Sequence, residues 1–201
     1  QAEEIIPYWT GRSMREKILA RMTPEWHECY SAGMFTEFME QRGPGHTCGG
    51  EQVFTTGYLD YKAKIKETMD ALDYINDPDA VNKCEELKAM DISCDAVIIL
   101  GERYRELALT MAGKEADETR KAELMQIAAN LEVVPAHKPQ TFWQAIQLYW
   151  FTHLAVTTEL NPWDAFSPGR LDQHLNPYYE KDVEAGILDD DKALELLECL
   201  W

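Results

Sequence analysis

Residues 142–158 read F-W-Q-A-I-Q-L-Y-W-F-T-H-L-A-V-T-T, the most apolar stretch of the chain. Aromatic and aliphatic side chains recur on nearly every face that a helix of this sequence would present. A helix that is apolar all round is buried on all sides. The stretch therefore predicts a helix over residues 142–158, opened by Gln140 and Thr141, that is buried on all sides. His153 lies within it, and we interpret it as a core histidine with a hydrogen-bond partner.

The segment that follows, residues 161–179, reads N-P-W-D-A-F-S-P-G-R-L-D-Q-H-L-N-P-Y-Y. Ser167 followed by Pro168 is typical of an N-cap with proline at the first helical position, so a short helix is predicted to open there. The residue before a proline is disfavoured in the helical region. This helix is therefore predicted to end before Asn176 and Pro177.

Asp164 stands in the loop that precedes this predicted helix, between Trp163 and Phe166. Functional side chains are often found where a loop meets a rigid element, so Asp164 is a candidate pocket residue. The same spacing is compatible with a carboxylate that only caps a turn, with Arg170 and Asp172 as a surface ion pair. The residues alone leave both interpretations open.

The rest of the chain is organised as amphipathic helices separated by polar breaks. Val133 to Pro139, with two prolines, predicts an extended connector into the helix over residues 142–158. Asp77 before Pro78 predicts an N-cap. Apolar residues at helical spacing predict helices over residues 12–22, 24–33, 34–41, 58–75, 78–112 and 119–131.

Residues 42–57 read R-G-P-G-H-T-C-G-G-E-Q-V-F-T-T-G and hold five glycines. The segment lacks the lysine of a phosphate-binding loop, so the glycines indicate a strand or loop in close contact with another part of the molecule. His46 in its centre is compatible with a structural role or a functional one. Cys48 has no neighbour in sequence that would lower its pKa, and we interpret it as a buried packing residue.

The composition excludes several classes of function. The 201 residues include 19 Lys and Arg against 36 Asp and Glu, a net charge of -17, which disfavours nucleic acid and anionic membranes as partners. No apolar run reaches the roughly 18 residues of a membrane span. The five cysteines form no C-x-x-C pair, so neither a disulfide framework nor a metal site is expected, and a reducing cytoplasm fits best.

Both ends suggest an internal fragment of a longer protein. The chain starts at Gln1, and Trp201 falls inside an amphipathic pattern that has no C-cap. We therefore expect residues 1–201 to be part of a single domain that is truncated at both ends.

Three segments carry a resemblance to a known family. They are M-F-T-E-F-M-E-Q-R-G-P-G-H-T at 34–47, V-V-P-A-H-K-P-Q-T-F-W-Q-A-I-Q-L-Y-W-F at 133–151, and T-T-E-L-N-P-W-D-A-F-S-P-G-R-L-D-Q-H-L-N-P-Y-Y at 157–179. Together they resemble the glycyl radical enzymes, the superfamily that includes pyruvate formate-lyase. S-P-G-R-L-D-Q is typical of several branches. W-D-A-F combined with P-G-H-T favours the branch that dehydrates trans-4-hydroxy-L-proline.

This resemblance implies an α/β enzyme whose ten-stranded β/α barrel is wrapped by helices, of which this chain would be a predominantly α-helical fragment. It implies no directly bound cofactor. A glycyl radical is instead installed by an activating enzyme that uses S-adenosylmethionine and an iron–sulfur cluster, and it passes to a barrel cysteine that abstracts a substrate hydrogen. Water loss would then give 1-pyrroline-5-carboxylate. The family's G-C-x-E and radical glycine segments are absent from these 201 residues, so the fragment alone is expected to be inactive. A homodimer is expected.

By position in the matching motifs, Phe38, His46 and Asp164 fall where this branch lines its substrate pocket. The resemblance implies that Asp164 pairs with the substrate ammonium, that His46 protonates the leaving hydroxyl, and that Phe38 packs on the ring and excludes water. One alternative is another glycyl radical lyase, acting on choline, a diol or glycerol, or an arylacetate. A non-catalytic helical interaction module is the other.

Overall fold

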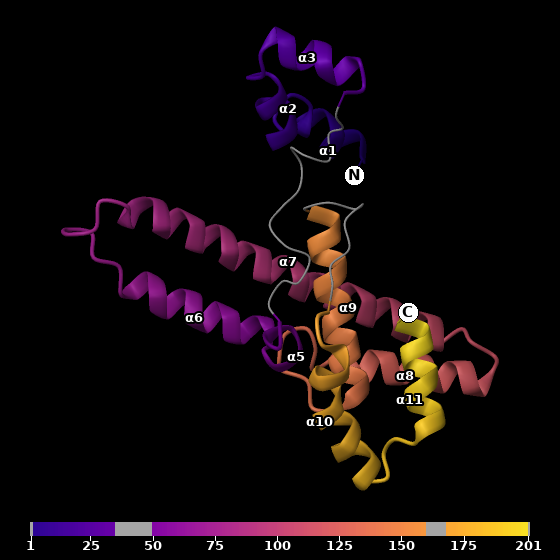
Figure 1. Cartoon of the computed structure of the whole chain (residues 1–201). Coiled ribbons are helices and arrows are strands. Elements are labelled where there is room, and N and C mark those ends of the chain that lie inside the picture. Colours follow the sequence, from indigo (N-terminus) through magenta and orange to yellow (C-terminus); the bar gives the residue numbers. More distant parts are fainter. Residues whose placement is uncertain (1, 35–49, 160–167, 201) are drawn as a thin grey trace. The chain divides into compact units, whose positions relative to one another are not determined.

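The computed structural model describes residues 2–34, 50–159 and 168–200, shown in Figure 1. The chain divides into two compact units, Gln1–Pro44 and Gly45–Trp201. Within the described ranges, every regular element is a helix, which confirms the predicted helical character. The helix predicted over 34–41 lies outside the described residues, apart from Met34.

In residues 2–34, the first unit contains three short helices, α1 (Ala2–Trp9), α2 (Met14–Leu19) and α3 (Pro24–Ser31). Ser13 opens α2 with a capping box, since its hydroxyl accepts from the Glu16 N–H while the Glu16 carboxylate accepts from the Ser13 N–H. Thr23 caps α3 in front of the proline at its first position, as the sequence predicts. Local capping therefore defines α2 and α3, which bury none of their residues.

The second unit is assembled around α9 (Phe142–Glu159). The structure confirms the helix predicted over residues 142–158. It also places this helix at the centre of the unit, because α9 contacts helices from both sides of it in the sequence (Figure 1). The other helices in residues 50–159 and 168–200 are α5 (Gln52–Thr55), α6 (Tyr58–Asp70), α7 (Ala80–Ala112), α8 (Glu118–Asn130), α10 (Leu171–Glu184) and α11 (Asp190–Leu200). The long α7 packs against α6 along one part of its length and against α8 along another.

Burial of α9 is less complete than its composition predicts. Its first half packs in the core, where Ala145 and Leu148 are almost fully buried. Trp150 is 43% exposed, and residues 152–157 are only partly buried. The prediction of burial on all sides is therefore wrong for the second half. The physical reason is that the buried clusters formed by the neighbouring described helices lie along residues 142–151 of α9.

The helix after the second candidate segment is longer than predicted and starts later. It begins at Leu171 with Arg170 as its N-cap, and it continues to Glu184 with Pro177 inside it. A proline within a helix removes one backbone hydrogen bond and costs about 3 kcal/mol. Packing offsets this cost, because Leu175 is buried in the core and the Tyr178 phenol is hydrogen-bonded to α5. Tertiary contacts thus override the local signal.

Two helix boundaries around residue 77 also differ from prediction. α6 ends at Asp70, five residues early, and α7 begins at Ala80 with Asp79 as its N-cap. Asp77 is not that cap. Its carboxylate accepts from the Asp79 N–H at 3.0 Å and pairs with Lys83, so it forms a turn immediately before the helix.

The connector into α9 is turned rather than extended, which corrects the prediction for 133–139. Its N–H groups bond locally, as when His137 donates to the Val133 carbonyl at 2.7 Å, and the Val134–Pro135 peptide is cis. Two carbonyl groups of the connector face another helix, α6. Those of Pro135 and Ala136 accept from the first two N–H groups of α6, both at 2.9 Å. The connector therefore caps α6.

Candidate active site

The three predicted site residues, Phe38, His46 and Asp164, all lie outside the described residues, as does Cys48. Their predicted roles therefore stay predictions. The helices that flank their segments are described. α5 follows residues 35–49, α9 precedes residues 160–167, and α10 comes after them. The geometry of these three helices shows how the described ends of the two segments are anchored.

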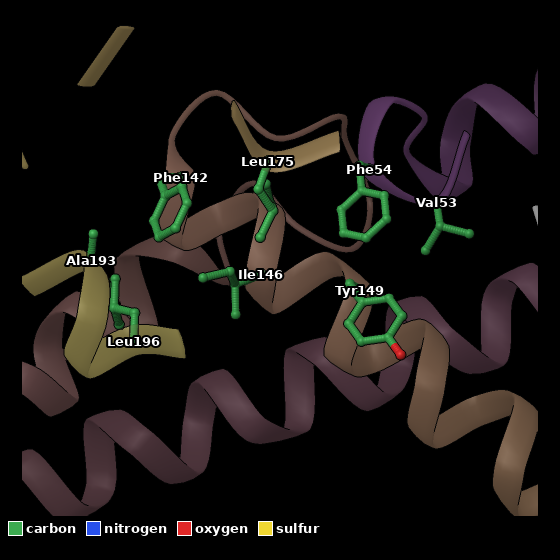
Figure 2. Packing of buried hydrophobic residues seen from close by; sticks show 9 residues of the cluster. Val53, Phe54, Phe142, Ile146, Tyr149, Leu175, Ala193 and Leu196 are labelled. Atoms are coloured by element: carbon green, nitrogen blue, oxygen red, sulfur yellow. The ribbon is translucent and has the colours of Figure 1, made fainter. Parts of the chain in front are cut away.

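A single buried cluster joins α5, α9, α10 and α11. Its members come from parts of the chain up to 143 residues apart and meet along α9 in Figure 2. They are Val53, Phe54, Phe142, Ala145, Ile146, Tyr149, Leu175, Ala193 and Leu196.

Phe54 is the residue of α5 that ties the flanking helices together. Its side chain is fully buried, and its ring stacks on Tyr149 of α9 at a centroid distance of 5.4 Å and an interplanar angle of 12°. It also stacks on His174 of α10 at 5.2 Å and 24°. The Tyr178 hydroxyl donates to the Phe54 carbonyl at 2.7 Å. One residue of α5 thus contacts both helices that flank the second segment.

Two of the phenols in this arrangement are protonated at neutral pH. Burial raises the pKa of Tyr149 and of Tyr178 above that of an exposed tyrosine. The Tyr149 oxygen lies 3.4 Å from His153 Nδ1, and the His153 ring stacks on Trp150 at 5.5 Å and 7°. His153 thus has the predicted hydrogen-bond partner, but it is only partly buried, so its prediction as a core histidine is wrong.

The start of α9 is fixed by two consecutive residues of α10. The buried Asp182 carboxylate accepts from the Phe142 N–H through Oδ2 at 2.7 Å. Lys181 donates from Nζ to the Gln140 carbonyl, also at 2.7 Å. A carboxylate at a helix N-terminus is favoured by the helix dipole as well as by the hydrogen bond. α10 is therefore joined to α9 at its first turn as well as through Phe54.

Arg170 and Asp172 form the exposed ion pair that the sequence suggests. Arg170 Nε lies 3.5 Å from Asp172 Oδ1, and the side chains are 67% and 70% exposed. The nearby guanidinium lowers the pKa of the Asp172 carboxyl. In the structure described here they are a surface pair.

The described residues hold one further concave feature near α5. It is an open groove between the start of α6 and the connector, lined by Thr55, Thr56, Asp60, Ala63, Lys64, His137, Lys138 and Gln140. Within residues 2–34, 50–159 and 168–200, no group of three or more His, Cys, Asp or Glu side chains could hold a metal ion. Nor is any helix in these ranges long and apolar enough to cross a membrane.

Comparison with known proteins establishes the class. Residues 1–201 match the pyruvate formate lyase-like family over their whole length, and the chain belongs to that family. Among individual relatives, it is 61% identical over 199 residues to trans-4-hydroxy-L-proline dehydratase of Clostridioides difficile, which covers 99% of this chain and 25% of that enzyme. It is 35% identical over 208 residues to isethionate sulfite-lyase of Desulfovibrio desulfuricans, again covering 99% of this chain and 25% of the relative.

Solved structures agree with this assignment. The fold matches the crystal structure of the C. difficile hydroxyproline dehydratase with trans-4-hydroxy-L-proline bound, with a TM-score of 0.89 and 61% identity over 99% of this chain and 25% of that one. It matches the B12-independent glycerol dehydratase of Clostridium butyricum with a TM-score of 0.83 and 32% identity, over 100% of this chain and 25% of that one. The chain thus spans about a quarter of the length of these relatives, and its structure fits a helical portion of a larger enzyme.

Sequence reasoning missed the residues that join the flanking helices. Phe54 sits in a glycine-rich segment and Tyr178 follows a proline, so neither lies in a pattern that predicts a core contact. Asp182 belongs to a run of charged residues that is typical of an exposed face. A weak signal existed in the apolar pair Val53 and Phe54, which stands out between polar neighbours.

Proposed function

We propose that the complete protein is a glycyl radical dehydratase that eliminates water from trans-4-hydroxy-L-proline to give 1-pyrroline-5-carboxylate. The observation that carries this proposal is the difference in identity between relatives. The hydroxyproline dehydratase is 61% identical, whereas the relatives named for isethionate and for glycerol are 35% and 32% identical. A substrate pocket is more similar between two enzymes of the same specificity.

Each proposed site residue has a physical role in this reaction. Asp164 would accept a charge-assisted hydrogen bond from the substrate ammonium, a bond that gains strength when water is excluded. His46 would donate a proton to the 4-hydroxyl as the C–O bond breaks, so that water leaves rather than hydroxide. Phe38 would cover the pyrrolidine ring and exclude water from the reactive intermediate.

The radical chemistry would be supplied from outside these 201 residues. An activating enzyme that uses S-adenosylmethionine and an iron–sulfur cluster would install a glycyl radical. This radical would pass to a cysteine, and the resulting thiyl radical would take a hydrogen from the carbon beside the ring nitrogen. The overall reaction needs no oxidant or reductant, because the atoms of hydroxyproline equal those of 1-pyrroline-5-carboxylate plus water. The proposal includes the activating enzyme and a second copy of the chain as partners, and a cytoplasmic location.

A different glycyl radical lyase is the second candidate, because relatives named for other substrates match the same 99% of the chain. Charge disfavours a diol, since a neutral substrate would leave Asp164 buried without a cationic partner. Choline carries a cation and remains compatible with the carboxylate. An interaction module without catalysis is disfavoured by the family match over residues 1–201.

Substitution of Asp164 tests the proposal. In the complete, activated enzyme, Asp164→Asn is expected to lower kcat/KM for hydroxyproline by about 100-fold, corresponding to the roughly 3 kcal/mol of a strong charge-assisted hydrogen bond. The glycyl radical signal in electron paramagnetic resonance should be unchanged. Glu180→Gln is the matched control, because Glu180 is an exposed acid on α10. Unchanged kinetics in Asp164→Asn, with the radical present, would remove Asp164 from the site.

His46→Gln tests the proton donor separately. A glutamine keeps a hydrogen-bonding group but cannot deliver a proton, so turnover should fall while the enzyme still folds and carries its radical. Loss of folded protein in this variant would instead assign His46 a structural role.

A further inference from the structure

One side of α7 is open to solvent in the described part of the second unit. α6 and α8 pack against α7 along different parts of its length (Figure 1). The buried residues of α7 include Cys94, Val97 and Ala108, which lie on one side of the helix at 3.6 residues per turn. Ile92 and Ile99 lie on the opposite side, where they are 68% and 51% exposed. Exposed apolar surface of this kind is typical of interaction sites.

This exposed side of α7 has the residue spacing of a contact between two helices. Its positions are separated alternately by four and three residues, as are the a and d positions of a coiled coil. All of them are exposed, and together they form what we call the α7 stripe: Glu85, Ala89, Ile92, Ala96, Ile99 and Arg103. The centre of the stripe is therefore apolar, and its two ends carry opposite charges.

The α7 stripe is complementary to itself when two copies are antiparallel. In a contact with twofold symmetry, each pair of facing residues occurs twice. One register gives the pairs Ile92 with Ala96, Ile99 with Ala89, and Glu85 with Arg103. Each isoleucine then faces an alanine, and large side chains opposite small ones allow the two helices to interdigitate. Each terminal charge faces the opposite charge of the other copy, which favours this orientation.

Other arrangements of the same two helices are disfavoured. A parallel pairing would place Glu85 against Glu85 and Arg103 against Arg103, and like charges in contact repel. An antiparallel pairing shifted by seven residues would place Ile92 opposite Arg103. The stripe therefore specifies both the direction and the register of the pairing.

Charged residues beside the stripe are compatible with this register. Lys88 of one copy lies next to Glu102 of the other, and both residues are exposed. Asp95 approaches Asp95 of the second copy across the symmetry axis, which is a like-charge contact. Each Asp95 already forms an ion pair with Lys62 of its own chain, with 2.9 Å between Oδ1 and Nζ. This ion pair offsets the repulsion.

We propose that the α7 stripe is an interface between two copies of the complete protein, with their α7 helices antiparallel in this register. The inference deepens the proposed function, which includes a second copy as a partner, and rests on it in that respect. It assigns that partner a surface and a geometry.

Charge reversal tests the pairing of Glu85 with Arg103. In the complete protein, Glu85→Arg and Arg103→Glu each place like charges at both ends of the stripe. We expect either variant to raise the dimer Kd by about 100-fold in sedimentation analysis. Glu118→Arg is the control and should match the parent, because Glu118 lies on α8 with its side chain 84% exposed.

Mixing the two reversed variants identifies the partner as a second copy. In a heterodimer of Glu85→Arg with Arg103→Glu, every arginine faces a glutamate, so an equimolar mixture should recover the Kd of the parent. The double variant should recover it as well. The two positions are 18 residues apart on one helix, or about 27 Å at 1.5 Å per residue. A contact within one chain therefore does not explain such a recovery.

Ile99→Gln tests the apolar centre of the stripe. We expect the dimer Kd to rise about 30-fold, since an isoleucine is lost from each copy. Ile75→Gln should leave the Kd unchanged, because Ile75 is 93% exposed and lies outside α7. At 1 M salt, where charges are screened beyond about 3 Å, the effects of the charge reversals should shrink while that of Ile99→Gln persists.

Several results would overturn the interface. A monomeric parent would do so, as would charge reversals that leave the Kd unchanged or that mixing does not restore. Reversals that lower the melting temperature at an unchanged Kd would instead assign the stripe to a contact within one polypeptide. Sedimentation does not depend on turnover. A parent that is inactive on hydroxyproline but shows the restored heterodimer would therefore refute the proposed reaction alone.

Discussion

Replacing Asp182 should loosen the central helix from its first turn. This carboxylate is 2% exposed and accepts the Phe142 N–H, the first amide of α9, at 2.7 Å. Its second oxygen, Oδ1, is buried and has no hydrogen-bond partner among the described residues. The single bond from Oδ2 is therefore the polar contact that this side chain makes in the described structure.

The expected loss in the opening free energy of α9 depends on which hydrogen bond and which charge each variant removes. Asp182→Ala leaves the buried Phe142 N–H without an acceptor, which costs about 1–3 kcal/mol. It also removes an anion from a helix N-terminus, which costs up to about 2 kcal/mol in a buried setting. We expect a loss of about 2–4 kcal/mol in the local opening free energy of α9. Asp182→Asn keeps an acceptor oxygen and loses only the charge, so about 1 kcal/mol is expected.

Hydrogen exchange of the complete enzyme measures this local free energy directly. Since about 1.4 kcal/mol corresponds to a factor of ten, Asp182→Ala should speed exchange of peptides from the first half of α9 by roughly 30- to 1000-fold. Asp182→Asn should speed it by about 5-fold, and Glu180→Ala, on the exposed face of α10, should leave it unchanged. Equal effects of Asp182→Ala and Asp182→Asn, or no effect of either, would refute the capping role.

Two more outcomes follow from contacts of the connector and of α6. A Cβ on Gly101 would lie 2.4 Å from Pro135 Cδ, so Gly101→Ala should lower the melting temperature although alanine favours helices by about 1 kcal/mol. Gly113→Ala, where the nearest atom would be 3.5 Å away, should be tolerated, and equal melting temperatures would contradict the close contact. Burial raises the pKa of Tyr58 despite its hydrogen bond to Thr152, so above pH about 10 the unfolded chain ionises first and stability falls as pH rises. Tyr58→Phe should weaken that alkaline loss in urea unfolding midpoints, and an unchanged pH slope would contradict it.

The sequence predicted those helices and caps that are determined by a few adjacent residues. The Thr23 cap before Pro24 and the apolar run of α9 each follow from a few adjacent residues, and the structure confirms both. The course of α10 through Pro177 could not be predicted in this way. The contacts that offset the proline lie on other helices, and one of them reaches α5, more than 100 residues earlier in the chain.

The candidate site shows the same limit in another form. Spacing does not distinguish Asp164 as a ligand for an ammonium from Asp164 as a turn cap, because both need a carboxylate in a loop. The roles given to Asp164, Phe38 and His46 depend on the likeness of whole segments to glycyl radical enzymes, and they stay predictions. Phe54 and Tyr178 were not predicted at all, since their roles depend on which helices meet.

The bond between Tyr178 and Phe54 also sets a delay during synthesis. Its partners are 124 residues apart, and at roughly 5–20 residues per second the ribosome needs about 6–25 s to pass from one to the other. During that interval α5 lacks both the hydroxyl and the His174 ring that hold it. The glycine-rich segment before α5 therefore emerges into the cell well before its anchor exists. Slower translation through α10 would lengthen the time in which Phe54 is open to chaperones or proteases.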